Sequence, residues 1–260
     1  MRTRTTARTA DSTSLAVQVE GDGPPLLLLA GQANHHGWWD RVRPDFADRT
    51  TVSLDWRGTG ASDPGPTDFT TRSLAEDVVA VLDHLDLPVV DVYGTSMGGR
   101  VAQWLAVDAP SRVGRLVLGC TTPGGRHAVE RSQEVRRRLA VADPVAAREA
   151  VAELMYTPAY RAEHPGPYAT LGDPDISALS ARRHLRASAR HDAYDELPRI
   201  SAPTLVLHGT DDQFAPAVNA HLVADRVPGA ELHLFEGARH AYFEECRPAA
   251  SRRVLGFLDA

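Results

Sequence analysis

The sequence VDVYGTSMGGR, residues 90–100, joins a short apolar segment to a run with helical spacing that continues from Val101. Between the two parts lies a Gly-x-Ser-x-Gly pentapeptide, Gly94-Thr95-Ser96-Met97-Gly98. A strand, this turn and a helix in immediate succession predict that Ser96 sits on a sharp, strained turn with its hydroxyl exposed at the end of a sheet. Ser96 is therefore the candidate nucleophile of an enzyme.

The pentapeptide alone is a weak signal, because glycine and serine are common residues. A serine hydroxyl is also a poor nucleophile at neutral pH and needs a base within hydrogen-bonding distance. The functional interpretation of Ser96 thus depends on a histidine and a carboxylate further along the chain, in the order Ser, Asp or Glu, His.

Composition favours a globular protein over a nucleic-acid-binding or membrane protein. The chain has 260 residues, which suits one large α/β domain with an inserted subdomain. A formal net charge of −6 argues against binding to nucleic acid, and all 28 basic residues are arginine. No run of apolar residues is long enough to span a membrane.

The cysteines and the N-terminal sequence bear on the compartment in which the protein is located. Cys120 and Cys246 form neither a disulfide framework nor a metal cluster, which favours a reducing compartment. The first ten residues are basic and rich in threonine, and no apolar segment of a secretory signal follows them. We expect a cytoplasmic protein whose first ten residues are partly disordered.

Strand-like and helix-like segments alternate along most of the chain, which predicts a mostly parallel sheet flanked by helices. Residues 15–20 alternate in polarity and predict an antiparallel edge strand, and residues 38–46 suggest a short helix. The further predicted strands are 26–30, 51–55, 89–93, 116–120, 204–208 and 231–235, and the further predicted helices are 71–85, 216–227 and 247–258.

The strand rhythm stops between residues 121 and 202. Helices are predicted there at 129–142, 144–155 and 176–190, broken by prolines such as Pro158 and Pro165. We therefore expect a helical cap of residues 123–202 inserted into a core domain made of residues 1–122 and 203–260.

A candidate acid and a candidate base follow two later strands. Asp212 lies in the loop after the predicted strand 204–208, and His240 lies in the loop after 231–235. Ligands of open α/β sheets bind beyond the carboxyl ends of the strands, where Ser96 also lies. We predict a Ser96–Asp212–His240 triad, in which His240 is the general base and Asp212 orients it. Asp211 is the alternative acid.

The oxyanion of an acyl-transfer reaction needs two hydrogen-bond donors. Met97 opens the helix after Ser96, so its backbone N–H has no partner within that helix. The loop after residues 26–30 would supply the second donor, for which we choose the backbone N–H of Gln32. This mechanism needs no metal and no organic cofactor.

Several motifs together resemble the α/β-hydrolase family over nearly the whole chain. They are Gly31 before the oxyanion loop, Asp55-x-Arg57-Gly58-x-Gly60-x-Ser62, the Gly94–Gly99 turn, Gly209-x-x-Asp212-x-x-x-Pro216 and Gly237-x-x-His240. The capped branch that is similar to enol-lactonases and esterases looks closest. The resemblance implies an α/β-hydrolase fold with an eight-stranded, mostly parallel sheet and a helical cap after its sixth strand, and it implies that Asp55, Arg57 and Gly58 shape a loop.

The chain departs from the family pattern in the oxyanion loop. Family members often carry His-Gly there, whereas this chain has Ala30-Gly31. His35 and His36 lie nearby, either to replace the missing side chain, to touch substrate or as solvated loop residues. Trp38, with its neighbour Trp39, is a candidate for an apolar wall of the substrate site or for the core.

The function predicted from these residues is hydrolysis of a small-molecule ester or lactone through an acyl-enzyme on Ser96. Arginines of the expected cap suit a carboxylate-bearing metabolite if they face inward, and a solvated face otherwise. Those arginines are Arg136, Arg137, Arg138, Arg182 and Arg183, accompanied by Tyr156, Tyr160 and Tyr168. A thioesterase, lyase, C–C hydrolase or perhydrolase on the same triad, and a slow-turnover ligand sensor, are the alternatives.

Overall fold

The computed structural model describes residues 2–260 and contains an eight-stranded sheet in the order β1-β2-β4-β3-β5-β6-β7-β8. The strands are β1 (Arg2–Arg8), β2 (Ser14–Glu20), β3 (Pro25–Leu29), β4 (Thr50–Leu54), β5 (Val90–Thr95), β6 (Val113–Gly119), β7 (Thr204–Gly209) and β8 (Glu231–Phe235). β1 and β2 pair antiparallel, β2 and β4 pair antiparallel, and all other neighbours are parallel. The predicted mostly parallel, eight-stranded sheet is confirmed.

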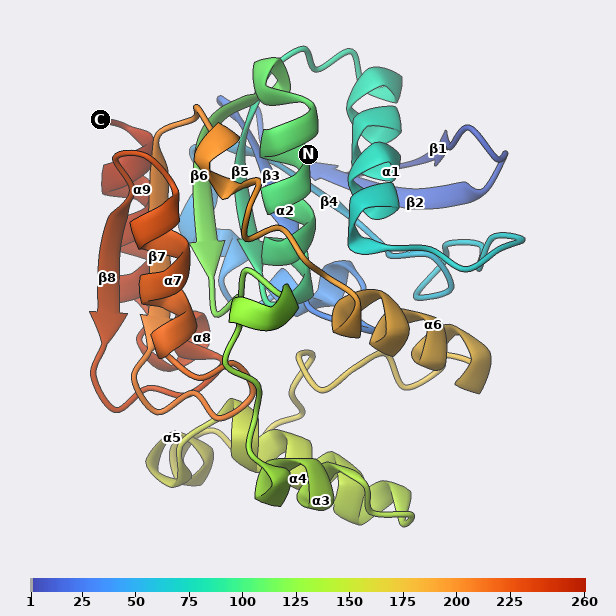
Figure 1. Cartoon of the computed structure of the whole chain (residues 1–260). Coiled ribbons are helices and arrows are strands. Elements are labelled where there is room, and N and C mark those ends of the chain that lie inside the picture. Colours follow the sequence, from blue (N-terminus) through green and yellow to red (C-terminus); the bar gives the residue numbers. More distant parts are fainter. Residues whose placement is uncertain (1) are drawn as a thin grey trace.

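Helices cover the sheet and fill the connection between β6 and β7 (Figure 1). They are α1 (Thr71–His84), α2 (Met97–Asp108), α3 (Gln133–Leu139), α4 (Pro144–Met155), α5 (Pro158–Glu163), α6 (Ala178–Ala189), α7 (Val218–Arg226), α8 (Tyr242–Glu245) and α9 (Ala249–Leu258). The residues Leu26–Leu29 of β3 are all fully buried, so both faces of the sheet are covered at its centre.

The segment between β6 and β7 holds four α-helices, α3 to α6 (Figure 1). Each begins where a side chain caps it: Ser132, Asp143, Thr157 and Ser177 accept hydrogen bonds from the first turns of α3, α4, α5 and α6. Helices α3, α4 and α5 lie at the end of the molecule where the arrows of the parallel strands point. The predicted helical interruption is therefore present at its predicted place in the chain.

The prediction for the N-terminal region was wrong. Residues 2–8 form β1, the outermost strand, and pair with β2 from Arg2↔Glu20 to Arg8↔Ser14, so that β2 is not an edge strand. Ala7 is the one side chain of β1 that is fully buried. The strand lacks the alternating apolar residues that reveal a half-buried strand, and its β-branched threonines were the remaining signal.

Three helix predictions need correction. Residues 38–46 form no α-helix but two 3₁₀ turns, η1 (His36–Trp39) and η2 (Arg43–Phe46), the second with a proline in its first turn. The helix expected at 129–142 shrinks to α3 (Gln133–Leu139). Helix α5 was missed because Pro158 was interpreted as a helix breaker, although a proline in the first helical turn is favourable.

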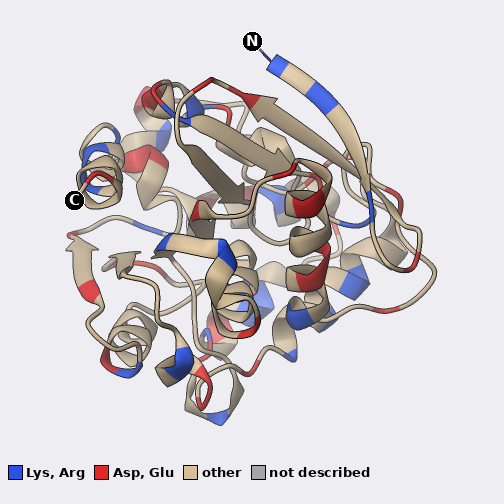
Figure 2. Cartoon of the chain, turned by 90° about the horizontal axis from the view of Figure 1, so that it is seen from above, with Lys and Arg blue, Asp and Glu red and all other residues tan. Residues whose placement is uncertain are grey.

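Charged residues of both signs are scattered over the molecule when it is seen from above (Figure 2). In the described part of the chain, no helix combines the length and the apolar character needed to cross a membrane. Several arginines at the surface pair with a carboxylate, for example Arg72 with Asp108 and Arg247 with Asp45.

Candidate active site

Ser96 lies between β5 and α2, on a strained backbone. Its φ and ψ are 55° and −120°, a conformation that is rare for a residue with a side chain. The strain is held by hydrogen bonds on both sides, because the Ser96 N–H donates to the carbonyl of Gly119 (2.9 Å) and its carbonyl accepts from Thr121 Oγ1 (2.9 Å). Ser96 is half-buried while its neighbours Thr95 and Met97 are buried.

The glycines around Ser96 are required by close packing. A Cβ on Gly98 would lie 2.1 Å from the carbonyl oxygen of Leu29, and a Cβ on Gly94 would lie 2.5 Å from the carbonyl oxygen of Gly98. The start of α2 therefore rests directly on the end of β3, where the loop that contains Gln32 begins. This contact fixes the position of Ser96 relative to that loop.

His240 and Asp212 form a buried hydrogen-bonded pair. The distance between His240 Nδ1 and Asp212 Oδ2 is 2.7 Å, and both residues are 4% exposed. The other oxygen of Asp212 accepts from the backbone N–H groups of Phe214 (2.8 Å) and Ala215 (2.9 Å). Asp211 instead lies at the exposed surface, so Asp212 is the acid that the structure places beside His240.

The protonation of this pair follows from its surroundings. Burial by itself would raise the pKa of Asp212, but the charge of His240 and the hydrogen bonds from His208 and His240 outweigh burial and hold that pKa below its ordinary value. An ionised Asp212 can only accept, so His240 Nδ1 carries the hydrogen. In the neutral tautomer that this hydrogen bond selects, the Nε2 atom of His240 has the lone pair with which a base accepts a proton.

A second histidine, His208, also contacts Asp212 and was not singled out from the sequence. His208 Nε2 lies 2.7 Å from the carbonyl oxygen of Ala215 and 3.1 Å from Asp212 Oδ2. A backbone carbonyl only accepts, so Nε2 of His208 is a donor, and its buried Nδ1 has no partner among residues 2–260. The available signal was its position at the end of β7, four residues before Asp212.

Ser96, Asp212 and His240 lie beyond the carboxyl ends of β5, β7 and β8, which run parallel in one part of the sheet. Within residues 2–260 no hydrogen bond joins the Ser96 hydroxyl to His240. Catalytic hydrogen bonds are often long in a free enzyme and shorten when substrate binds. The lack of a hydrogen bond between Ser96 and His240 is therefore compatible with a triad.

The two predicted oxyanion donors have no other use. Neither the backbone N–H of Gln32 nor that of Met97 donates to another described residue, and Gln32 is half-buried. Asn34 Nδ2 donates to the Gln32 carbonyl (2.8 Å) and stiffens the loop. Unpaired N–H groups at the start of a helix and in an adjacent loop are suited to hold a negative oxygen.

The two side chains proposed for substrate contact lie in different surroundings. Trp38 is 2% exposed and donates from Nε1 to Thr95 Oγ1 (2.9 Å), so it belongs to the core beside the Ser96 turn instead of lining an open site. His35 is half-buried, and its Nδ1 accepts from the backbone N–H of Gly37 (3.0 Å), which caps η1. The sequence left Trp38 open between a wall of the substrate site and the core, because only packing decides between these places.

One group in the described part of the chain has the composition of a metal site: His35, His36 and Asp55. Hydrogen bonds already occupy it. Asp55 Oδ1 lies 2.6 Å from His36 Nδ1 and accepts the backbone N–H of His36 (2.9 Å), while Asp55 Oδ2 accepts from Ala61 (3.0 Å). Burial would raise the pKa of Asp55, but these bonds hold it below its ordinary value, as for a carboxylate that organises a loop.

Arg57 and Gly58 likewise build structure. Arg57 donates to Asp77 at 2.6 and 2.7 Å and to Asp11 at 2.7 Å. A Cβ on Gly58 would lie 2.3 Å from Ser180 Oγ of α6, so this loop packs against the inserted helices. The geometry agrees with the structural role that the family resemblance implies.

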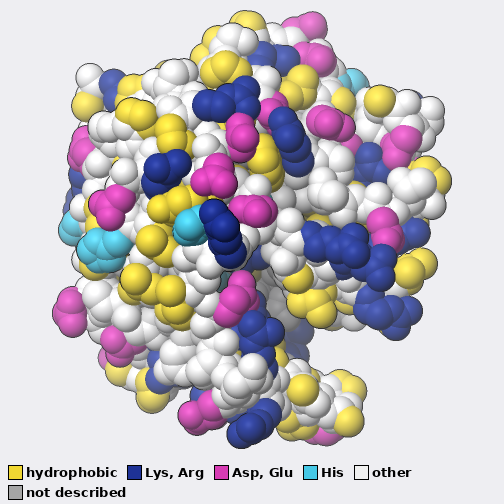
Figure 3. Space-filling model, in the orientation of Figure 1, with side chains coloured by type: hydrophobic (Ala, Val, Ile, Leu, Met, Phe, Trp, Pro, Cys, Tyr) yellow, Lys and Arg dark blue, Asp and Glu magenta, His cyan; other side chains and the backbone are white. Residues whose placement is uncertain are grey.

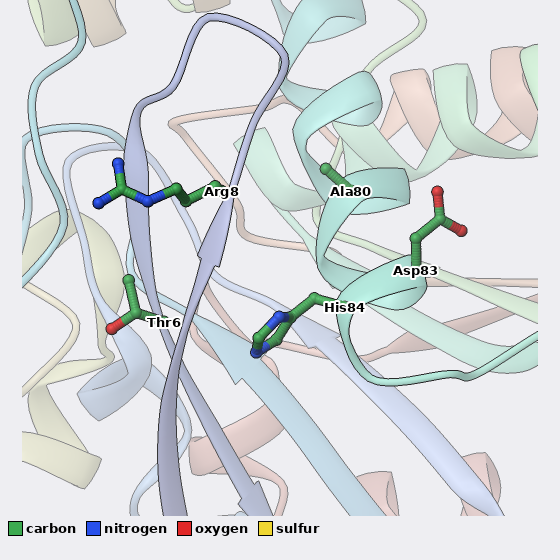
Figure 4. Close-up of a pocket in the computed structure, with 5 residues that line it drawn as sticks. All are labelled: Thr6, Arg8, Ala80, Asp83 and His84. Carbon is green, nitrogen blue, oxygen red and sulfur yellow. The ribbon is translucent and has the colours of Figure 1, made fainter.

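One open cavity lies away from Ser96. A cavity of about 550 Å³ is lined by Thr6, Arg8, Ala80, Asp83 and His84, between β1 and the end of α1 (Figure 4). His84 precedes β5, so this cavity lies at the end of the sheet opposite to Ser96. Figure 3 also shows a hollow near the centre of the face seen in Figure 1, with basic and acidic side chains around it.

Residues 24–245 match a family described as "alpha/beta hydrolase fold". The chain is 26% identical to 3-oxoadipate enol-lactonase 2 of Acinetobacter baylyi, over 87% of this chain and 85% of that protein. It is 30% identical to the pimeloyl-[acyl-carrier protein] methyl ester esterase of Nitrosomonas europaea, over 88% of this chain and 94% of that protein. The crystal structure of a hydrolase from Pseudomonas aeruginosa superposes with a TM-score of 0.85 at 30% identity, covering 99% and 98% of the two chains.

Proposed function

The chain belongs to the alpha/beta hydrolase family, and on that basis we propose that it hydrolyses carboxylic esters or lactones of small metabolites through Ser96, His240 and Asp212. The similar proteins named as an enol-lactonase and a methyl ester esterase support hydrolysis of an ester or lactone bond. The observation that carries the assignment of residues is the buried 2.7 Å contact between His240 Nδ1 and Asp212, beside the strained Ser96 turn.

In the proposed reaction, Ser96 Oγ attacks the ester carbonyl carbon while His240 Nε2 accepts the hydroxyl proton. Asp212 remains ionised and stabilises the imidazolium that forms. His240 returns the proton to the leaving alcohol as the tetrahedral intermediate collapses to an acyl-enzyme. His240 then takes a proton from water, which attacks the acyl carbon, and Ser96 leaves with that proton as the acid is released.

The N–H groups of Gln32 and Met97 would hold the oxyanion of both tetrahedral intermediates. Their positions are fixed before substrate binds, because the Gly98–Leu29 contact joins the two segments that carry them. Donors that are already oriented need no reorganisation as the charge develops. Loss of one such donor typically slows turnover by about 10²- to 10³-fold.

We further propose that residues 123–202 form a cap over a core of residues 1–122 and 203–260. Two contacts across this division support it. Arg100 Nη1 of α2 donates to the carbonyl of Ser188 in α6 (2.6 Å), and the N–H of Ala241 donates to the carbonyl of Met155 in α4 (2.9 Å). The inserted helices are thus attached beside both Ser96 and His240, where a substrate would have to bind.

The test is intact mass measurement after treatment with a fluorophosphonate, together with turnover of a short-chain chromogenic ester. Wild type should gain one phosphonyl adduct and hydrolyse the ester. Ser96→Ala should gain none and lose turnover by about 10³-fold or more. Ser201→Ala, at an exposed position, is the matched control and should behave as wild type. Ester turnover that survives in Ser96→Ala would refute the proposal.

A further inference from the structure

Arg131 lies beside the acid and base of the site. It belongs to the segment before α3, and its guanidinium carbon is 5.3 Å from the centre of the Phe214 ring. The Phe214 ring is in turn 5.1 Å from the imidazole of His240, and the Phe214 N–H donates to Asp212 Oδ1 (2.8 Å). One aromatic ring therefore separates a cation of the inserted segment from the predicted general base.

Arg131 has no counter-ion among residues 2–260. No carboxylate lies within 4.0 Å of it, and no hydrogen bond of its guanidinium is found. Its neighbour Glu130 pairs with Arg136 instead (3.1 Å). Every other half-buried arginine of residues 123–202 does pair with a carboxylate: Arg138 with Glu153, Arg161 with Glu149 and Arg183 with Asp68.

The environment of Arg131 disfavours an uncompensated charge. Burial lowers its pKa, and the charges of Glu130 and Asp212 oppose that shift only in part. A cation that is partly removed from water without a partner is costly, and an anionic ligand would remove that cost. The Nη and Nε atoms of Arg131 are not fully buried, so they remain accessible to such a ligand.

A second guanidinium adds to the positive potential here. Arg100 lies one turn after Ser96, where its N–H donates to the Ser96 carbonyl (3.2 Å), and no carboxylate pairs with it in the described part of the chain. Burial first, and then the charge of Arg131, lower the pKa of Arg100 to about 10. Arg100 and Arg131 are therefore close enough to repel one another, and an anion bound at Arg131 would reduce that repulsion.

We propose that Arg131 binds a free carboxylate of the substrate, so that the chain acts on half-esters or lactones of dicarboxylic acids. The inference rests on the proposed function, since it names the substrate class of the same site. The ester carbonyl lies at Ser96, the linking methylene groups lie along Phe214, and the distal carboxylate meets Arg131. The five fixed donors of a guanidinium suit two-point recognition of a carboxylate.

The experiment compares charged and neutral substrates of equal shape. The kcat/KM is measured for monomethyl glutarate and monomethyl suberate, each beside the neutral analogue in which a carboxamide replaces the free carboxylate. Wild type should prefer the charged ester by about tenfold or more, as expected for one charge-assisted contact. Arg131→Gln should abolish that preference and leave turnover of the neutral esters within about twofold.

Two further variants make the result specific. Arg131→Lys keeps the charge and should retain part of the preference, while Arg148→Gln, at an exposed position of α4, should change nothing. Inhibition by free glutarate and suberate should weaken by the same factor in Arg131→Gln. This binding measurement has no catalytic step.

The outcomes separate this inference from the proposed function. Equal loss for charged and neutral esters in Arg131→Gln would mean that Arg131 only supports Phe214, and it would overturn the carboxylate site. So would a wild type that hydrolyses both kinds of ester without preference, while Ser96→Ala hydrolyses neither. A wild type that is not labelled by the fluorophosphonate and hydrolyses no ester would refute the proposed function itself.

Discussion

His208 shows how a single side chain can tune the predicted acid. Its Nε2–H is shared between the Ala215 carbonyl and the same Asp212 oxygen that holds His240. Each hydrogen bond that the Asp212 carboxylate accepts withdraws negative charge from it. His208 therefore reduces the electrostatic pull of Asp212 on His240.

Replacement of His208 by leucine should move the acid limb of the pH profile. Without the His208 donor, Asp212 presents more negative charge to His240, which favours the imidazolium. The base is then protonated at higher pH, so the midpoint of the acid limb of kcat/KM should shift upward. The Ala215 carbonyl also loses its partner, which should cost about 1–3 kcal/mol of unfolding free energy.

His208→Gln should recover part of the original midpoint, because the amide can donate to the same acceptors. His221→Leu, at an exposed position of α7, serves as the control. A lower stability without any change in the midpoint would show that His208 acts only in packing.

Gly98→Ala should be among the most damaging small substitutions in the chain. The added Cβ would lie 2.1 Å from the carbonyl oxygen of Leu29, and backbone cannot yield as a flexible side chain can. We expect a loss of several kcal/mol of unfolding free energy, measured by chemical denaturation, or failure to fold. Gly256→Ala is the matched control, since its Cβ meets nothing within 4 Å and the position lies in α9. It should stabilise the protein by up to about 1 kcal/mol, and a Gly98→Ala variant that is equally stable would contradict the packing argument.

At the level of residues, the sequence allowed prediction of those site residues whose positions follow from spacing along the chain. Asp212 and His240 were predictable because each follows a strand, and parallel strands bring their carboxyl ends to one edge. His208 and Arg131 were not, because their importance depends on which atoms their side chains face. Trp38 illustrates the same limit, since an indole in an active-site loop can fill the core or line a pocket.

Helix α4 is connected to the turn that carries His240. The guanidinium of Arg239 donates to the carbonyls of Glu153 and Tyr156 (3.0 Å for Tyr156), and Ala241 N–H donates to that of Met155 (2.9 Å). Carbonyls at the end of a helix lack partners within it, and a cation there is favourable. The residues on both sides of His240 therefore satisfy the end of an inserted helix.

Arg239→Met should weaken both stability and turnover. Loss of the cation and of its hydrogen bonds should lower the unfolding free energy by about 1–2 kcal/mol. Ester turnover should fall as well, because the backbone on one side of His240 loses its anchor. Thermal unfolding and kcat on a neutral ester measure the two effects. Arg253→Met, which removes an exposed ion pair with Glu231, should change stability by less than about 0.5 kcal/mol. A stability loss with unchanged kcat would limit the role of Arg239 to holding α4.

At the level of elements, prediction succeeded where apolar spacing and caps agreed. Helix α4 was predicted at its observed bounds, because Asp143 and Pro144 mark its start. Strand β1 was missed because its stability comes from pairing with β2, which is a long-range contact that residues 2–8 do not reveal. The helix expected at 129–142 was too long, because Ser132 caps α3 several residues later.

On the scale of the whole molecule, one buried acid makes stability depend on pH. Glu244 has a side chain that is 1% exposed, and it connects α8 with the inserted segment by accepting from Tyr156 (2.7 Å). Its Oε1 has no partner among residues 2–260. Burial is the main cause that raises the pKa of Glu244 to about 6, from an ordinary value of 4.5.

The sign of the effect follows from proton binding. Between about pH 4.5 and pH 6 the folded state holds the Glu244 proton more tightly than the unfolded state, so stability falls as the pH rises through this window. Glu244→Gln has no such loss. The stability of the variant relative to wild type should therefore rise by on the order of 2 kcal/mol from pH 4 to pH 7.

Chemical denaturation at several pH values measures this difference. Glu163→Gln, at an exposed position of α5, is the control and should give a constant difference from wild type. A constant difference for Glu244→Gln as well would mean that Glu244 ionises with the same affinity in both states.

The charge of the edge strand β1 affects how two copies of the chain associate. β1 is one of the two edge strands of the sheet, and Arg2, Arg4 and Arg8 are exposed along it. Figure 2 shows basic residues on this N-terminal strand. A free strand edge is a template on which another chain can add, and edge-to-edge growth of this kind leads to aggregation. Two copies approaching through β1 would bring rows of guanidinium groups against each other, at a cost that dissolved salt reduces. These arginines, which did not reveal the strand in the sequence, therefore oppose association of two copies through the free edge of β1. This opposition should be weakest in concentrated salt.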